Sequence, residues 1–389
     1  MDALEHLRVI AVMVAIHGDS KNKQCLENTC GDAVGLLMTY RCNLKCKYCY
    51  IQTKQNKDMS LEMAQTILEP FLMTDGDFVE IVFMGGETLL AIDVIRPLVE
   101  WVEQGTWKRK FRFIGTTNGT LLTPELREWL QKHRKSLTLG LSFDGIPSAQ
   151  RNNRGNDDVD TDFFVQTWPY QPLQMTINTE TVHQMAEGVI YLLEKGALVH
   201  PNVAYEEREW PKESIDEYGN QLNKLIYYYQ THQEKPLITQ FQHNLKEYAD
   251  NIKSHPIQKE TCGAGHGFQV FDIDGTSYPC HILSPLVLRD EKLSAIQNGL
   301  VAQTTDYSDS RCDTCPYVTS CPTCIASNYL YRNELQKRDD THCKIMQLEV
   351  KAFIKKEVLR LQQQEQLSAK DAAVIDAIRR IRNYESSRM

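Results

Sequence analysis

Three cysteines lie within eight residues of this chain, in the stretch "CNLKCKYC". Cys42, Cys46 and Cys49 are spaced C-x3-C-x2-C, and Tyr48 and Tyr50 flank the last of them. Three thiolates with no fourth cysteine nearby suit a [4Fe–4S] cluster in which the protein holds three irons and leaves one free to bind another molecule. The alternative is a zinc site that a distant residue completes, because structural zinc takes four ligands.

A second group of cysteines follows after a long gap. It comprises Cys262, Cys280, Cys312, Cys315, Cys321, Cys324 and Cys343, of which the four from "CDTCPYVTSCPTC" are spaced C-x2-C-x5-C-x2-C. Clustered cysteines in a chain without export signals are more often ligands than disulfide partners. Taken alone, this group also fits a pair of zinc ribbons.

The composition is that of a soluble globular protein. Of the 389 residues, 42% are hydrophobic and 24% are charged. No apolar run is long enough to span a bilayer, and the stretch 9–16 lacks the flanks of a signal peptide, so a buried strand is expected there. The net charge of -8 argues against nucleic acid as a partner. We expect a cytoplasmic protein without a membrane partner.

The elements that must position the first cysteines alternate between strands and helices. Strand patterns at 34–40, 78–87 and 110–117 alternate with helical patterns at 60–72, 93–105 and 123–133, and the alternation continues to about residue 205. Repeated β/α units predict a parallel sheet that is closed or partly closed into a barrel, in which reactive groups follow the strands. The Cys42 loop directly follows the first predicted strand.

With that context, the cysteine motif and the aromatic Tyr48 resemble the signature of radical S-adenosylmethionine (SAM) enzymes. The chain is most similar to the SPASM subfamily, which includes sulfatase-maturating enzymes and peptide maturases. The resemblance implies a partial (β/α)6 TIM-type barrel, a cysteine-rich SPASM domain and C-terminal helices. It also implies that a cluster on Cys42, Cys46 and Cys49 cleaves SAM to a 5′-deoxyadenosyl radical.

The same resemblance implies where SAM binds. The stretches "MGGET", "TTNGT" and "LSFDG" correspond to family motifs at strand ends. The implied SAM contacts are Tyr48, Gly85, Gly86, Glu87, Asn118, Ser142 and Arg154. Tight turns at "MGGET" and "TTNGT", and a solvated loop arginine at Arg154, remain alternatives.

The resemblance assigns the second cysteine group to two auxiliary clusters, which gives three [4Fe–4S] clusters in all. Cys312, Cys315, Cys321 and Cys343 would hold the outer cluster, and Cys262, Cys280 and Cys324 the inner one. One residue fewer than in the family pattern precedes Cys324. Sulfatase-maturating enzymes have a fourth inner cysteine, which this chain lacks, so the inner cluster has an open iron or borrows a ligand such as His266.

The position of the aspartate base of sulfatase-maturating enzymes is occupied by His281, a candidate base because imidazole titrates near neutrality. A loop histidine without a role is the alternative.

From the resemblance we expect a maturase that abstracts hydrogen from a ribosomally made precursor peptide and forms an oxidative crosslink, with a cysteine thioether as one outcome. A carbon–carbon crosslink, an oxidative decarboxylation and formylglycine formation stay open. A flavodoxin or ferredoxin would supply electrons. A cysteine-rich zinc-binding interaction protein is the non-enzymatic alternative.

The expected organisation has five parts. They are an N-terminal extension (1–33), the barrel (34–235), a helical linker (236–257), the SPASM domain (258–345) and a C-terminal helical segment (346–389). The extension is too short for a winged-helix leader-binding domain, and Cys25 and Cys30 within it are expected to be unligated thiols. The C-terminal segment should form helices that break near residues 367 and 368.

Overall fold

A computed structural model describes residues 32–205, 208–254, 263–264, 267–304, 307, 309–321 and 323–387. The predictions for Cys25, Cys30, Cys262, His266 and the strand at 9–16 lie outside the described residues.

The predicted parallel sheet is present. Strands β1 (Asp32–Thr39), β2 (Phe78–Gly85), β3 (Lys110–Thr117) and β4 (Leu137–Leu141) pair in parallel in the order β4-β3-β2-β1. Strands β5 (Leu173–Ile177) and β6 (Val199–Val203) form a second parallel pair. The amide of Phe143 donates to the Gln174 carbonyl at 2.9 Å and links β4 to β5, so the six strands form an open barrel. The expected partial (β/α)6 barrel is confirmed.

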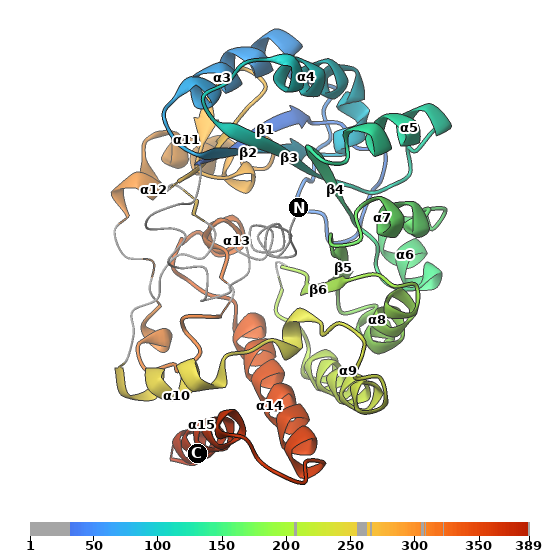
Figure 1. Cartoon of the computed structure of the whole chain (residues 1–389). Helices are drawn as coiled ribbons and strands as arrows, with labels where there is room; N and C mark the ends of the chain where they lie inside the picture. Colours follow the sequence, from blue (N-terminus) through green and yellow to red (C-terminus); the bar gives the residue numbers. More distant parts are fainter. Residues whose placement is uncertain are drawn as a thin grey trace.

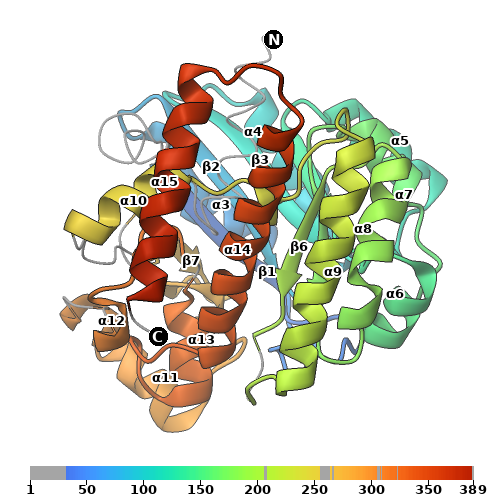
Figure 2. The ribbon, with the colours of Figure 1, turned by 90° about the horizontal axis from the view of Figure 1, so that it is seen from below.

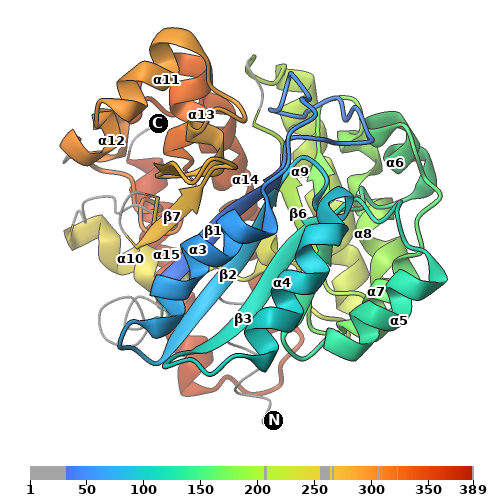
Figure 3. The same ribbon diagram turned by 90° about the horizontal axis from the view of Figure 1, so that it is seen from above.

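The cysteine-rich region contributes to this sheet. Strand β7 (Phe268–Phe271) pairs in parallel with β1, and β8 (Ser277–Tyr278) pairs antiparallel with β7. Figure 3 shows β7 beside β1, on the opposite side from β2. The region after residue 263 is therefore attached to the barrel by main-chain hydrogen bonds next to the strand that leads into the Cys42 loop.

Helices cover the outer face of the barrel (Figure 1). They are α3 (Leu61–Met73), α4 (Ile92–Gln104), α5 (Pro124–His133), α6 (Pro147–Arg154), α7 (Thr161–Thr167), α8 (Met185–Glu194) and α9 (Lys212–Thr231). Their starts follow local rules: Ser60 caps α3 by accepting from the Met63 amide at 3.1 Å, and Pro124 occupies the first turn of α5 after the cap Thr123. Apolar helix faces pack on buried strand residues such as Leu36 and Phe83.

The remaining helices lie in and around the cysteine-rich region. They are α10 (Leu245–Ser254), α11 (Asp290–Gln297), α12 (Leu300–Gln303), α13 (Ile325–Arg332), α14 (Asp340–Gln362) and α15 (Ala369–Ser386). Short 3-10 turns occupy Thr88–Ala91, Val182–Gln184, Thr239–Phe241, His281–Leu283 and Ser310–Cys312. The predicted C-terminal break is confirmed, because Ser368 and Asp371 form a capping box that starts α15. Figure 2 shows α14 beside α9, where the Tyr218 hydroxyl donates to Glu349 at 2.5 Å.

Within the described part of the chain, no helix combines the length and the apolar character needed to cross a membrane.

Candidate functional site

The three cysteines of the first motif come together on the loop that follows β1. Cys42, Cys46 and Cys49 are partly exposed. Burial raises the pKa of the Cys46 thiol, and the nearby charges of Cys49 and Cys42 raise it further. The Lys54 ammonium donates to Cys49 Sγ at 3.3 Å. The loop thus gathers three thiols close to one another, with Lys54 and Arg154 as nearby cations.

Long-range hydrogen bonds hold this loop in place. The Tyr48 hydroxyl donates to Asp144 at 2.6 Å, and the Lys47 amide donates to the Asn153 carbonyl at 2.9 Å. The Asn118 amide group donates to the Asn43 side chain at 2.8 Å. The predicted residues Tyr48 and Asn118 therefore fix the cysteine loop against the ends of β3 and β4.

Arg154 and Asp144 form a buried ion pair next to this loop. Arg154 Nη2 lies 2.9 Å from Asp144 Oδ1, and the guanidinium lies 5.4 Å from the centre of the Tyr48 ring. The solvated-loop alternative for Arg154 is wrong, since its side chain is 8% exposed. Its Nε has no hydrogen-bond partner among the described residues. A buried cationic donor without a partner suits an anionic ligand group.

The two glycines after β2 are required by a close approach of main chain to main chain. A Cβ on Gly85 would lie 2.2 Å from the Thr39 carbonyl oxygen, and one on Gly86 would lie 2.1 Å from the Arg41 carbonyl oxygen. Gly85 also has a φ of 140°. Whatever ligand binds beside them, these glycines let the turn after β2 pack directly on the start of the cysteine loop.

Glu87 links the ends of two neighbouring strands. Its buried carboxylate accepts from the Thr117 hydroxyl at 2.6 Å, the Asn118 amide at 2.8 Å and the Leu89 amide at 3.0 Å. The Ser142 amide donates to the Thr117 carbonyl at 2.9 Å, which brings the third motif to the same edge. With both oxygens of Glu87 occupied in this way, its clearest structural role is to orient the loops around the cysteines.

Four cysteines of the second group also come together. Cys312 and Cys321 are buried, and Cys315 and Cys343 are partly exposed. Burial raises the pKa of Cys321 to about 12, and the charges of the three other thiols act in the same direction. Cys312 lies in a short turn and Cys343 on the first turn of α14, so two separate chain segments supply the group.

Cys280, Cys324 and Tyr50 pack against the same hydrophobic cluster. Burial raises the pKa of Tyr50, and the charges of Cys49, Cys280 and Cys324 add to the effect. Each of the two thiols accepts an amide hydrogen bond at the start of a helical turn, Cys280 from Ile282 at 3.4 Å and Cys324 from Ser327 at 3.3 Å. Cys262 lies outside the described residues.

The imidazole of His281 contacts both Tyr50 and Cys280. Its Nε2 lies 2.9 Å from the Tyr50 hydroxyl, and its Nδ1 lies 3.8 Å from Cys280 Sγ. Burial lowers the pKa of His281 to about 4, so the ring is neutral near neutral pH.

Sequence reasoning missed the partners that position the predicted residues. Asp144, Asn153, Lys54 and Tyr50 all hold parts of the cysteine loops. Asp144 belongs to the quoted "LSFDG" stretch, and Tyr50 directly follows Cys49, so adjacency to a motif was the available signal. Their partners are 96 and 231 residues away in the chain, where no periodic pattern reveals them.

Among the described residues, no three His, Cys, Asp or Glu side chains converge on one point as ligands of a single metal ion would. The thiols instead form groups of three and four that influence one another electrostatically. Soft thiolate groups of this kind fit iron–sulfur clusters.

Comparison with known proteins agrees with this chemistry. The sequence signature of the Radical SAM superfamily matches residues 36–161, which run from β1 to the start of α7. The chain carries a radical SAM domain. This domain contains the cysteine trio and all three strand-end motifs. The Radical SAM superfamily implies one [4Fe–4S] cluster and SAM, and it is residues 36–161 of this chain that match it.

Two relatives are similar in sequence to part of this chain. The uncharacterized protein MJ0907 of Methanocaldococcus jannaschii is 32% identical over 111 residues, which are 28% of this chain and 38% of MJ0907. The antilisterial bacteriocin subtilosin biosynthesis protein AlbA of Bacillus subtilis is 22% identical over 323 residues, which are 77% of this chain and 69% of AlbA. The second similarity extends well beyond the radical SAM domain.

Solved structures share the fold over most of the chain. The structure of anSMEcpe with bound AdoMet has a TM-score of 0.60 at 18% identity, covering 89% of this chain and 98% of that one. SuiB of Streptococcus suis, bound to the precursor peptide SuiA, has a TM-score of 0.52 at 17% identity, covering 88% of this chain and 81% of SuiB. The shared architecture thus includes the region that follows the radical SAM domain.

Proposed function

We propose that this radical SAM enzyme is a SPASM-type maturase that modifies a side chain of a ribosomally made peptide. The observation that carries the proposal is the similarity to AlbA, which spans 77% of this chain rather than the radical SAM domain alone. The name of AlbA refers to the biosynthesis of a bacteriocin, and SuiB was solved with a precursor peptide bound. A precursor peptide is therefore the substrate class that we assign to this chain.

The grouped thiols indicate which residues would hold the clusters. Cys42, Cys46 and Cys49 would hold the cluster that binds SAM. Cys312, Cys315, Cys321 and Cys343 would hold the outer auxiliary cluster, and Cys280 and Cys324, with Cys262 from outside the described residues, the inner one. When bound, the first cluster and SAM supply an organic radical that removes a hydrogen atom from the substrate.

The residues at the barrel edge would position SAM. Arg154 is proposed to donate its unpaired Nε–H to the SAM carboxylate, since a buried guanidinium binds a carboxylate strongly. Asp144 keeps Arg154 and Tyr48 in place by accepting from both. Gly85, Gly86, Glu87, Asn118 and Ser142 would shape the rest of the site, because they join the strand ends to the cysteine loop.

His281 is proposed to accept a proton from the substrate. Its Nδ1 lies 3.8 Å from Cys280 Sγ, and the ring is unprotonated near neutral pH, so it can accept a proton. Burial, however, lowers the pKa of the ring to about 4 and makes it a weaker base than the near-neutral imidazole expected from the sequence. Tyr50 would act on the reaction through His281, because its hydroxyl holds the imidazole at 2.9 Å.

For the product, we propose an oxidative crosslink, with a cysteine thioether as the specific candidate. In a thioether, one S–C bond replaces an S–H and a C–H bond, so the peptide loses two hydrogen atoms. A carbon–carbon crosslink involves the same loss, whereas oxidative decarboxylation releases carbon dioxide. We further propose a cytoplasmic location and a flavodoxin or ferredoxin as electron donor, since this chemistry needs low-potential electrons.

The test combines cofactor analysis with a peptide assay. Anaerobically reconstituted enzyme should contain iron and sulfide, and should form 5′-deoxyadenosine from SAM when reduced. With precursor peptides supplied, mass spectrometry should detect the loss of two hydrogen atoms, and the crosslinked cysteine should resist alkylation.

The matched control replaces Cys42, Cys46 and Cys49 by Ala, which should abolish SAM cleavage while about eight irons of the auxiliary clusters remain. Zinc without sulfide in the wild-type protein would contradict the proposed function and favour the zinc-binding interaction protein.

A further inference from the structure

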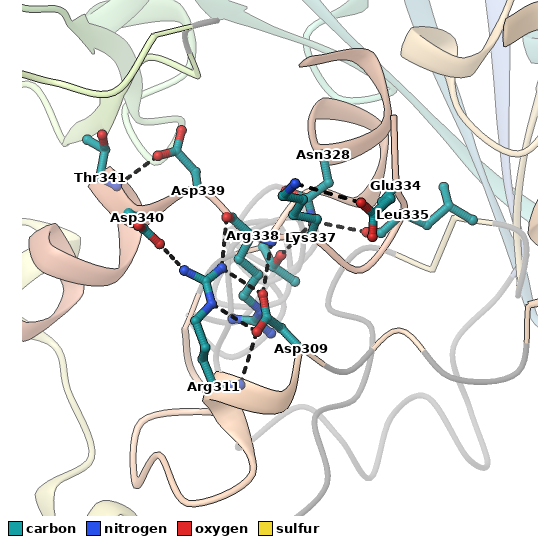
Figure 4. A network of polar contacts seen from close by, with 11 residues as sticks. Asp309, Arg311, Asn328, Glu334, Leu335, Lys337, Arg338, Asp339, Asp340 and Thr341 are labelled. Atoms are coloured by element: carbon teal, nitrogen blue, oxygen red, sulfur yellow. Dashed lines mark hydrogen bonds and ion pairs between the residues drawn. The ribbon is translucent and has the colours of Figure 1, made fainter. Parts of the chain in front are cut away.

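Arg338 lies just before α14, between the segments that carry the outer cysteines. Its main chain is fixed on both sides: its amide donates to Asp309 Oδ2 at 3.2 Å, and its carbonyl accepts from Arg311 Nη2 at 2.9 Å. Figure 4 shows Arg311 and Asp309 gathered around Arg338. The position of Arg338 is therefore set by its backbone contacts rather than by its own charge.

Two nitrogens of the Arg338 guanidinium lack a hydrogen-bond partner among the described residues. The residue is 6% exposed, and its Nε and Nη2 are buried without a hydrogen bond to any described residue. The carboxylate of Asp309 accepts instead from Arg311, whose Nε and Nη2 lie at 2.9 Å and 2.6 Å. A buried cation with two free donors is unfavourable unless something in its vicinity accepts from it.

The surroundings of Arg338 indicate what that acceptor is. Arg338 lines the same small cavity as Cys321 and Cys343. Burial raises the pKa of the Cys312, Cys321 and Cys343 thiols, and the charge of Arg338 opposes that rise at all three. The free donors thus belong to a side chain that is close to three of the four outer thiols.

We propose that Arg338 is the counter-charge of the outer auxiliary cluster and donates its free N–H groups to the sulfur atoms of that cluster. The inference rests on the proposed function for the presence of the cluster. A positive charge and hydrogen bonds to sulfur stabilise the more negative, reduced form of a cluster. Arg338 should therefore raise the reduction potential of the outer cluster above the value that its four cysteines alone would set.

The test uses the full chain with Cys42, Cys46 and Cys49 replaced by Ala, so that only the auxiliary clusters contribute to the paramagnetic spectrum. In this background Arg338→Gln removes the charge, whereas Arg338→Lys keeps the charge but loses the planar pair of donors. The matched control is Lys337→Gln, which removes the adjacent charge at an exposed position. Each protein is titrated with reductant while its spectrum, iron and sulfide are measured.

Arg338→Gln should shift one auxiliary signal to a lower potential, Arg338→Lys should shift it less, and Lys337→Gln should leave it unchanged. Loss of one cluster's iron in Arg338→Gln, with retention in Arg338→Lys, would also support the role. Full iron with an unchanged potential in Arg338→Gln would overturn it. If Arg338→Gln does not fold, a wild-type titration curve for Arg338→Lys would overturn it instead. Zinc without sulfide in the parent protein would contradict the proposed function itself, which distinguishes the two failures.

Discussion

The Tyr50 hydroxyl lies 2.9 Å from His281 Nε2, although 231 residues separate the two in the chain. Tyr50 directly follows Cys49, and His281 directly follows Cys280. The two rings are tilted by 55° with their centres 5.5 Å apart. This contact joins the loop of the first cysteine motif to the cysteine-rich region, and it places the candidate base beside both.

Replacing Tyr50 by Phe should remove the hydrogen bond to His281 and keep the ring. We expect a loss of about 1 kcal/mol in the free energy of unfolding, because a buried partner is left unpaired. Modified peptide per 5′-deoxyadenosine should also fall, since His281 is less well oriented. Denaturant unfolding and product quantification measure the two effects. Tyr227→Phe, at a 57% exposed position, is the control. An unchanged product ratio in Tyr50→Phe would argue against a role for this contact in the reaction.

Replacing Arg154 by Lys should weaken SAM binding about tenfold or more, since a charge-assisted hydrogen bond contributes about 1.5–3 kcal/mol. Equilibrium dialysis of the reconstituted protein measures the affinity. Arg151→Gln is the matched control, because Arg151 lies on the same helix but is exposed and pairs with Asp157. Equal SAM affinity in Arg154→Lys and wild type, with full iron content, would contradict the proposed contact.

Replacing Gly86 by Ala should destabilise the junction between β2 and the cysteine loop. The added Cβ would lie 2.1 Å from the Arg41 carbonyl oxygen, and overpacking of this kind costs about 1–3 kcal/mol or more. Iron retention on the first cluster should fall together with stability. Gly219→Ala is the control: it adds a methyl group in α9 at ordinary contact distance and should stabilise by about 0.5–1 kcal/mol. Wild-type stability of Gly86→Ala would show that the loop can move away without cost.

Glu349 should make stability depend on pH. Burial raises its pKa from 4.5 to about 7, even though Tyr218 donates to it. A carboxyl with a raised pKa in the folded state contributes fully below about pH 4.5, and its contribution declines as the pH rises towards 7. Glu349→Gln removes the ionisation and should be more stable than wild type at pH 8, with little difference at pH 4.5. Urea unfolding at both pH values measures this, and an equal difference at both would contradict the assignment.

The local features of the chain could be predicted from its sequence alone. The helical patterns at 60–72, 93–105 and 123–133 and the break near residues 367 and 368 depend on neighbouring residues, and helices α3, α4 and α5 and the start of α15 appear where expected. The three cysteines Cys42, Cys46 and Cys49 lie on a single loop, so their proximity also follows from their spacing in the sequence. Alternation of strand and helix patterns was sufficient for a parallel sheet closed or partly closed into a barrel, because parallel strands joined by helices have few other arrangements. The partial (β/α)6 form was implied by the family resemblance.

Only the tertiary structure decided how distant segments meet. The pairing of β7 with β1 carries the cysteine-rich region to the barrel, and a four-residue strand has too little pattern to reveal its partner. The contact between Tyr50 and His281 and the position of Arg338 near the outer thiols likewise join residues far apart in the chain. In the sequence, each partner of such a contact is only a single polar residue. The free energy of the contact depends on its burial and on the partner that folding brings to it, so the sequence pattern does not reveal it.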